Sequence, residues 1–167
     1  MIFSFKLVRN RIGGNYMVNL PSGVTGFYHS EAEKPPKVEG KQFKQLIFDL
    51  IISSGGKVIC FNTPQYSANF YYTQVEISGD RLYILLNEHY PYLAFASTVE
   101  YGDIKFIDNN LLYERFSPFY QIITSVELNS LFDKDMIKKA DLNNAEWEQI
   151  AYWKPNIVGE IIFNYWD

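Results

Sequence analysis

The residues able to do nucleophilic or acid–base chemistry are few and stand apart in this sequence. The chain has one cysteine, Cys60, and two histidines, His29 and His89. Cys60 lies within the apolar run 58–61, where we expect a buried and unreactive thiol, because a nucleophilic cysteine needs an exposed, electropositive site. Each histidine could act as an acid or base near neutral pH. No serine, cysteine or carboxylate spacing marks a catalytic partner, so both are predicted to be surface residues.

Motifs for binding metals or phosphates are also incomplete. Two histidines and one cysteine are too few for a typical His/Cys zinc site. Asp133 and Asp135 lack the rest of a calcium loop, and the glycine-containing segments 13–14 and 54–56 lack the Lys-Ser/Thr pair of a phosphate loop. The sequence therefore predicts a protein that is not an enzyme and has no metal or cofactor.

Composition indicates one globular domain with an unusual share of aromatic residues. Of 167 residues, 47% are hydrophobic and 17% are aromatic, and a chain of this length usually forms a single domain. The net charge of −4 disfavours nucleic-acid binding, which normally requires a basic excess. The apolar runs are too short for a signal peptide or a membrane span. We therefore expect a cytoplasmic protein without a membrane partner, and its lone cysteine excludes an internal disulfide.

The first forty residues are predicted to contain short strands followed by a loop. Residues 2–8 alternate apolar and polar side chains as in a half-buried strand, and residues 16–20 are consistent with a second strand. The segment 21–40 is rich in proline, glycine and charged residues, which favour turns. It is predicted to be a long exposed loop.

Residues 41–54 give the clearest helix signal. Apolar residues recur there with helical spacing, at Phe43, Leu46, Ile47, Leu50 and Ile51. Phe48 and Ile52 widen this stripe, so we expect the helix to be covered on more than one side. Glycines after the helix favour its termination, and the apolar run 57–61 is predicted to be a buried strand.

The rest of the chain predicts an antiparallel meander followed by helices. Strands are expected at 70–77 and 81–87, on either side of a hairpin turn at 78–80, and shorter strands follow. The remaining expected elements are strands at 92–97, 104–107 and 119–126, and helices at 111–116 and 142–153, the last capped by Asp141. The sequence thus predicts a single α+β domain over residues 1–167, with an antiparallel sheet of about five to seven strands. The 41–54 helix packs on one face, and C-terminal helical segments close the core.

Tyrosines and carboxylates are interleaved in the predicted sheet region. Tyrosine anchors many protein interfaces because it offers a large contact area at low entropic cost, and surrounding carboxylates would steer a basic partner. This pattern has two interpretations, a solvated sheet face or a surface that binds a basic protein. In the second interpretation the predicted partner-binding residues are Tyr72, Glu76, Asp80, Tyr83, Glu88, Tyr90 and Glu100.

The C-terminal string 147–167 is the most distinctive part of the sequence. Its large apolar side chains are expected to hold the last segment on the core, with Gly159 allowing a close approach. Residues 153–167 read Trp-x-Pro-x-x-x-Gly-Glu-Ile-Ile-Phe-Asn-x-Trp-Asp, a pattern that resembles the tails of small bacterial immunity proteins. The resemblance implies a cytoplasmic antitoxin that binds and blocks a polymorphic, contact-dependent or secreted toxin. It carries over no binding residues, because such proteins cover their toxins in different ways.

Two functions are therefore expected. The first is a non-enzymatic immunity protein that neutralises a cognate toxin with a basic surface by covering its active site. The alternative is a domain that binds a small molecule or a peptide in an aromatic pocket. A deep pocket lined by convergent polar groups would favour the alternative, whereas a flat or convex acidic face would favour the toxin inhibitor.

Overall fold

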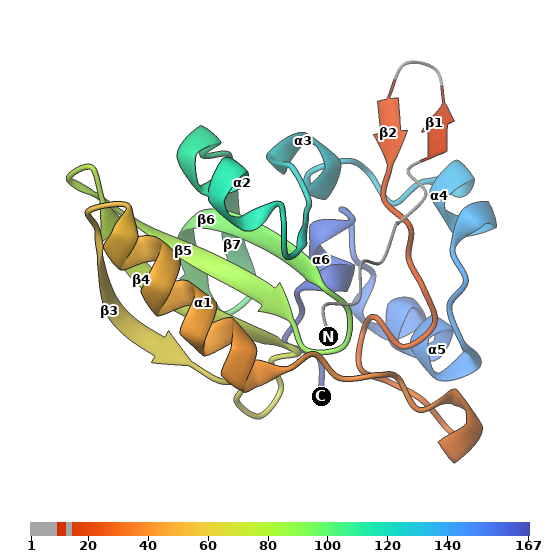
Figure 1. The fold of residues 1–167 in the computed structure, drawn as a ribbon. Coiled ribbons are helices and arrows are strands. Elements are labelled where there is room, and N and C mark those ends of the chain that lie inside the picture. The colour runs from red at the N-terminus through yellow and green to blue at the C-terminus, as the bar shows by residue number, and fades with distance from the viewer. Residues whose placement is uncertain (1–9, 13–14) are drawn as a thin grey trace.

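The computed structural model describes residues 10–12 and 15–167 and shows an α+β fold, as predicted (Figure 1). The predicted strand 2–8 lies outside the described residues. The main sheet has the strand order β3-β4-β5-β6-β7 with antiparallel neighbours, and β8 pairs in parallel with β6. Its strands are β3 (Lys57–Asn62), β4 (Phe70–Ile77), β5 (Asp80–Asn87), β6 (Tyr92–Glu100), β7 (Asp103–Ile107) and β8 (Gln121–Ile122). A separate hairpin consists of β1 (Asn10–Ile12) and β2 (Asn15–Met17).

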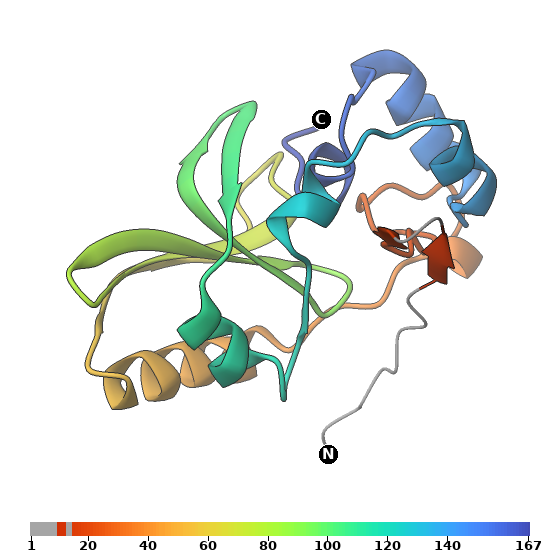
Figure 2. The same cartoon turned by 90° about the horizontal axis from the view of Figure 1, so that it is seen from above.

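Different helices cover the two faces of the main sheet. They are η1 (Glu31–Glu33), α1 (Gly40–Ser53), α2 (Asn110–Phe116), α3 (Ser125–Leu128), α4 (Lys134–Lys139), α5 (Asn144–Trp153) and α6 (Gly159–Ile162). α1 and α2 pack on one face, which we call the helix face, and α6 with the C-terminal residues packs on the other, the tail face (Figure 2). Among the described residues, no helix combines the length and the apolar character needed to cross a bilayer.

Strand alternation separates the core into two apolar clusters, one on each face. β4 sends Val75 into the cluster beneath α1, and it sends Phe70 into the cluster beneath the C-terminal segment. The β4–β5 hairpin turns at Ser78 and Gly79, whose φ angles of 52° and 81° are those of the type I′ turn that matches the twist of paired strands. The predicted hairpin and its face assignment are therefore confirmed.

α1 confirms the helix predicted at 41–54 but is covered on one side only. The side chains that pack on the sheet are fully buried, namely those of Phe43, Ile47 and Ile51. The prediction that Phe48 and Ile52 would also be covered is wrong, since they are 38% and 61% exposed. α1 lies on the outside of the molecule, against one face of the sheet (Figure 1).

Truncating a buried residue of α1 is expected to destabilise the domain. Ile47→Ala should lower the free energy of unfolding by about 2–5 kcal/mol, because it leaves a cavity between α1 and the sheet. Ile52→Ala, on the exposed side of the same helix, should change it by less than about 0.5 kcal/mol. Urea unfolding followed by circular dichroism measures both values. Equal effects of the two substitutions would show that α1 is packed differently.

The segment 21–40 is mostly irregular, as predicted, but residues 21–28 are not exposed. Val24 and Thr25 are 0% and 1% exposed. The carboxylate of Glu146 in α5, itself fully buried, accepts hydrogen bonds from the backbone N–H groups of Gly23 (2.6 Å) and Thr25 (2.9 Å) and from the Thr25 hydroxyl (2.5 Å). The exposed-loop prediction fails here because a residue more than a hundred positions later anchors the segment.

Three buried asparagines join this loop, the sheet and the C-terminal segment. Asn69 precedes β4 and Asn87 ends β5, and both side chains donate to the carbonyl oxygens of Val24 and Ile162 at 2.8–3.1 Å. The backbone N–H of Asn164 donates to Oδ1 of Asn69 (2.9 Å). The C-terminal segment is therefore fixed to the tail face by hydrogen bonds as well as by apolar packing.

Helix capping shifts two predicted elements. α5 begins two residues later than expected, because Asn143 rather than Asp141 is its N-cap and forms a reciprocal capping box. The predicted strand 119–126 is reduced to β8, since Thr124 caps α3 directly afterwards. The capping hydrogen bonds of Asn143 and Thr124 decide where α5 and α3 begin, and helix or strand propensity alone does not reveal them.

Candidate binding surface and adjoining cleft

A row of tyrosines crosses the tail face of the sheet. Tyr72 of β4 and Tyr83 of β5 have ring centroids 6.5 Å apart. Tyr72 also packs on the buried Phe70 (6.2 Å), whose other edge contacts Tyr165 (5.3 Å). Tyr165 in turn contacts Tyr101 of the β6–β7 turn (5.1 Å). We call Tyr72, Tyr83, Tyr101 and Tyr165 the tyrosine strip.

The strip is accessible and is held by ordered elements. Tyr72, Tyr83 and Tyr165 are half-buried, and Tyr101 is 70% exposed. The first two project from paired strands, whereas Tyr165 belongs to the segment fixed by the asparagines. The β6–β7 hairpin contains a bulge between Ala96 and Thr98 and rises toward the C-terminal segment (Figure 2). That bend brings Tyr101 onto Tyr165.

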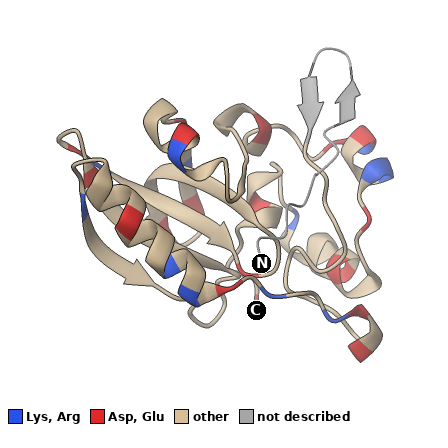
Figure 3. Ribbon diagram, in the orientation of Figure 1, with Lys and Arg blue, Asp and Glu red and all other residues tan. Residues whose placement is uncertain are grey.

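Carboxylates near the strip lie mainly at the ends of strands. Figure 3 shows the middles of the sheet strands largely free of charge, with Asp and Glu at the turns and on the helices. Glu76 faces the tail side but pairs with Lys57 (3.7 Å) and Arg81 (3.3 Å). Asp80 and Glu100 stand at the two hairpin turns, and neither forms an ion pair with another described residue. Within the described part of the chain, the acidic groups near the strip that lack an ion-pair partner therefore lie at the hairpin ends and not along its middle.

Two of the predicted partner-binding residues lie elsewhere. Glu88 and Tyr90 follow the far end of β5, where Glu88 pairs with Lys37 (3.8 Å) and the Tyr90 hydroxyl donates to the Ser22 carbonyl (2.5 Å). These contacts hold the 21–40 loop. The structure thus brings together Tyr72, Glu76 and Tyr83, places Asp80 and Glu100 at the nearby turns, and separates Glu88 and Tyr90 from them.

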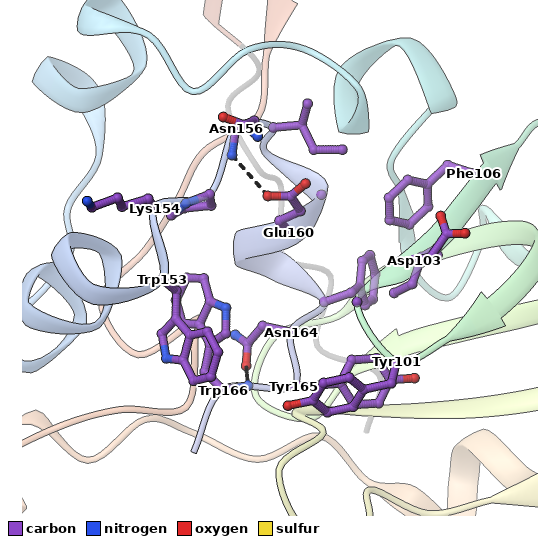
Figure 4. Close-up of a pocket in the computed structure, with 16 residues that line it drawn as sticks. Tyr101, Asp103, Phe106, Trp153, Lys154, Asn156, Glu160, Asn164, Tyr165 and Trp166 are labelled. Atoms are coloured by element: carbon purple, nitrogen blue, oxygen red, sulfur yellow. Dashed lines mark hydrogen bonds between the residues drawn. The ribbon is translucent and has the colours of Figure 1, made fainter.

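A cleft of about 400 Å³ adjoins the strip, between the β6–β7 hairpin and the C-terminal segment (Figure 4). Trp153, at the end of α5, forms one side, and Tyr101 and Tyr165 lie across from it. Two exposed carboxylates also line the cleft, Asp103 from β7 and Glu160 from α6. We call this site the tail cleft. It combines flat aromatic walls with acidic groups that come from two separate elements.

The inner side of the tail cleft is closely packed. Gly159 is buried, and a Cβ atom at this position would overlap the ring of Phe106. Phe106 packs on Phe163 with ring centroids 5.9 Å apart. The close approach that the sequence predicted for Gly159 is therefore confirmed, and the cleft is backed by the core.

One hydroxyl group of the strip, that of Tyr165, has a shifted pKa because it is partly buried. Burial raises the pKa of Tyr165 to about 12, and neighbouring Tyr72 adds to the shift. A raised pKa favours the neutral phenol. The Tyr165 hydroxyl therefore stays protonated at physiological pH and can donate a hydrogen bond to a bound group.

The residues first considered for catalysis lie apart from one another and have other surroundings. Cys60 is exposed, contrary to prediction, because β3 is an edge strand rather than a buried one. The surface prediction for His89 is also wrong, since this residue is 8% exposed and its Nδ1 lies 2.8 Å from the Pro36 carbonyl oxygen. His29 is exposed as predicted and pairs with Glu148 (3.0 Å). Within the described ranges, no cluster of three or more His, Cys, Asp or Glu residues could hold a metal ion.

The sequence did not predict the tail cleft. The sequence does not single out Tyr101, and it indicates only a structural role for Trp153 and Tyr165 in the string 147–167. The available signal was the density of aromatic residues in 147–167, but the partner of this segment, the β6–β7 turn, is fixed by tertiary structure.

Comparisons with known proteins do not assign this site. No protein-family model, no curated protein and no solved structure matches the chain. The function has to be inferred from the contacts, exposure and charge of the tyrosine strip and the tail cleft.

Proposed function

We propose that this chain is an immunity protein that binds a cognate bacterial toxin through the tyrosine strip and covers the toxin's active site. The observation that carries the proposal is the strip itself, four partly exposed tyrosines, of which Tyr72 and Tyr165 both contact the buried Phe70. Tyrosine is enriched among the residues that dominate binding energy at protein interfaces. The similarity of residues 153–167 to the tails of immunity proteins supports the choice of partner.

The surroundings of the strip favour tight binding of a basic protein. Its residues stand on paired strands and on a segment fixed by buried hydrogen bonds, so little conformational entropy would be lost on binding. Asp80 and Glu100 at the hairpin turns would attract a basic toxin surface and speed its approach. Occlusion of a cleft that binds an anionic substrate would then block the toxin in the cytoplasm without any reaction catalysed by this chain.

The tail cleft favours a second candidate, a domain that binds a small molecule or a peptide. Its volume of about 400 Å³ falls in the range of about 300–1,000 Å³ typical of ligand pockets. In this case the cleft would act alone, and Tyr72 and Tyr83 on the sheet would make no contribution to binding.

Co-expression with toxins encoded beside this gene tests the first proposal, followed by measurement of binding kinetics with the toxin that is captured and inhibited. Tyr72→Ala and Tyr83→Ala should each raise the dissociation rate about 30-fold, corresponding to a loss of about 2 kcal/mol at an interface anchor. Tyr113→Ala on α2, which is 42% exposed on the helix-face side, is the matched control and should have no effect. Association should also slow as salt rises. Unchanged kinetics in both strip variants would refute the role of this surface.

A further inference from the structure

The tail cleft has the chemistry of a site for a flat cation. The faces of Trp153 and of the tyrosines across from it carry negative π-electron density, which attracts a cation placed over the ring. Asp103 and Glu160 add two carboxylates from different walls of the cleft (Figure 4). Aromatic faces and carboxylates together are the groups that bind a guanidinium ion.

The charged side chains that line the cleft favour a cation over an anion. One oxygen of Glu160 accepts a hydrogen bond from the Asn156 backbone N–H (2.9 Å), and a carboxylate has further lone pairs with which to accept from a ligand. Asp103 forms no ion pair with any other residue in the described part of the chain. Lys154 belongs to the lining, but its side chain extends away from the space between the aromatic walls (Figure 4).

We propose that the tail cleft receives an arginine side chain of the partner protein. Arginine is favoured over lysine because its planar guanidinium stacks on aromatic rings and bonds carboxylates through a rigid fork of N–H donors. Tyr101 and Tyr165 belong to both the strip and the cleft, so an arginine held here would lie at the edge of the proposed interface. The identity of the partner rests on the proposed function, whereas the chemical preference of the cleft does not.

A peptide titration tests the cleft without any toxin. The probe is acetyl-Gly-Arg-Gly-amide, and the matched peptides carry citrulline, which is uncharged and nearly isosteric, or lysine. The readout is the set of indole N–H signals of the three tryptophans in a ¹⁵N–¹H spectrum, with the Trp153 signal assigned from Trp153→Phe. The Trp153 signal should shift and saturate with a dissociation constant on the order of 1 mM, while Trp147, which does not line the cleft, stays unchanged.

Charge-removing variants give the second arm of the test. The double variant Asp103→Asn, Glu160→Gln should weaken arginine-peptide binding at least about tenfold, since the loss of even one charged contact corresponds to about that change. Glu114→Gln on α2, an exposed residue beyond the other face of the sheet, is the matched control and should bind normally. Citrulline should bind at least about tenfold more weakly than arginine.

Each other outcome overturns the proposal in a recognisable way. Equal binding of citrulline would show a cleft for uncharged ligands, and equal binding of lysine would remove the preference for guanidinium. No shift of the Trp153 signal would show that the cleft is not a site for this side chain. None of these results would refute toxin binding by the strip, which Tyr72→Ala and Tyr83→Ala test separately.

Discussion

Deletion of residues 163–167 is expected to unfold the domain. It removes Phe163 and Trp166, which are 2% and 9% exposed and each contribute about 1.5–3 kcal/mol when buried. It also removes Asn164, whose backbone N–H and C=O both bond to Asn69, and an unsatisfied buried group costs about 1–3 kcal/mol. These losses are comparable with the entire stability of a typical domain, about 5–15 kcal/mol.

Circular dichroism and thermal unfolding of the shortened chain measure this effect. Deletion of the exposed Asp167 alone is the matched control and should leave the melting temperature unchanged. A chain without 163–167 that keeps a native spectrum and melting temperature would show that the tail is a free arm. The tail cleft, whose walls include Tyr165 and Trp166, would then need another explanation.

Local patterns predicted the parts of the fold that local interactions determine. The spacing of Phe43, Ile47 and Ile51 is sufficient to predict α1, because a helix with one apolar stripe has few other ways to bury it. Ser78-Gly79-Asp80 predicts the β4–β5 hairpin because the turn conformation favours small or flexible residues at positive φ. In both cases the residues that predict the element are the ones whose burial or backbone conformation forms it.

Predictions of burial failed where distant residues decide the environment. Cys60 lies in an apolar run, yet β3 is the edge of the sheet, a position set by strand order and not by composition. His89 follows polar residues at a strand end, yet the 21–40 loop folds back and its Pro36 carbonyl meets the imidazole. An apolar run indicates that a strand forms, but it does not tell whether both sides of that strand are covered.

For the candidate site as well, the sequence predicts the features that depend on neighbouring residues and misses those that depend on distant ones. Alternation correctly placed Tyr72 on one face of β4, and antiparallel pairing brings Tyr83 beside it. The interleaving of tyrosines and carboxylates also groups Glu88 and Tyr90 with them, but both residues follow the end of β5, where their side chains contact Lys37 and the Ser22 carbonyl of the 21–40 loop. The grouping fails for these two residues because the sequence does not show that this loop folds back onto the end of the strand.

Replacement of Glu146 by alanine is expected to release the 21–40 loop. The carboxylate accepts hydrogen bonds from three backbone N–H groups, those of Gly23, Thr25 and Asn143. Alanine leaves these groups without an acceptor in the interior, at about 1–3 kcal/mol each, so the free energy of unfolding should fall by about 3 kcal/mol or more. Asn144→Ala, at an exposed position of the same helix, is the matched control and should change the free energy of unfolding by less than about 0.5 kcal/mol.

A second substitution at Glu146 separates the loss of its hydrogen bonds from the loss of side-chain packing. Glu146→Gln keeps one acceptor oxygen but turns an amide N–H₂ toward existing donors, so its stability should lie between those of Glu146→Ala and the unmodified chain. Native-state hydrogen exchange should show the amides of Gly23 and Thr25 losing protection first, while β4 and β5 exchange only on global unfolding. Uniform loss of protection would mean that the loop and the sheet unfold as one unit. Full protection at Gly23 and Thr25 in Glu146→Ala would contradict the anchoring role of the carboxylate.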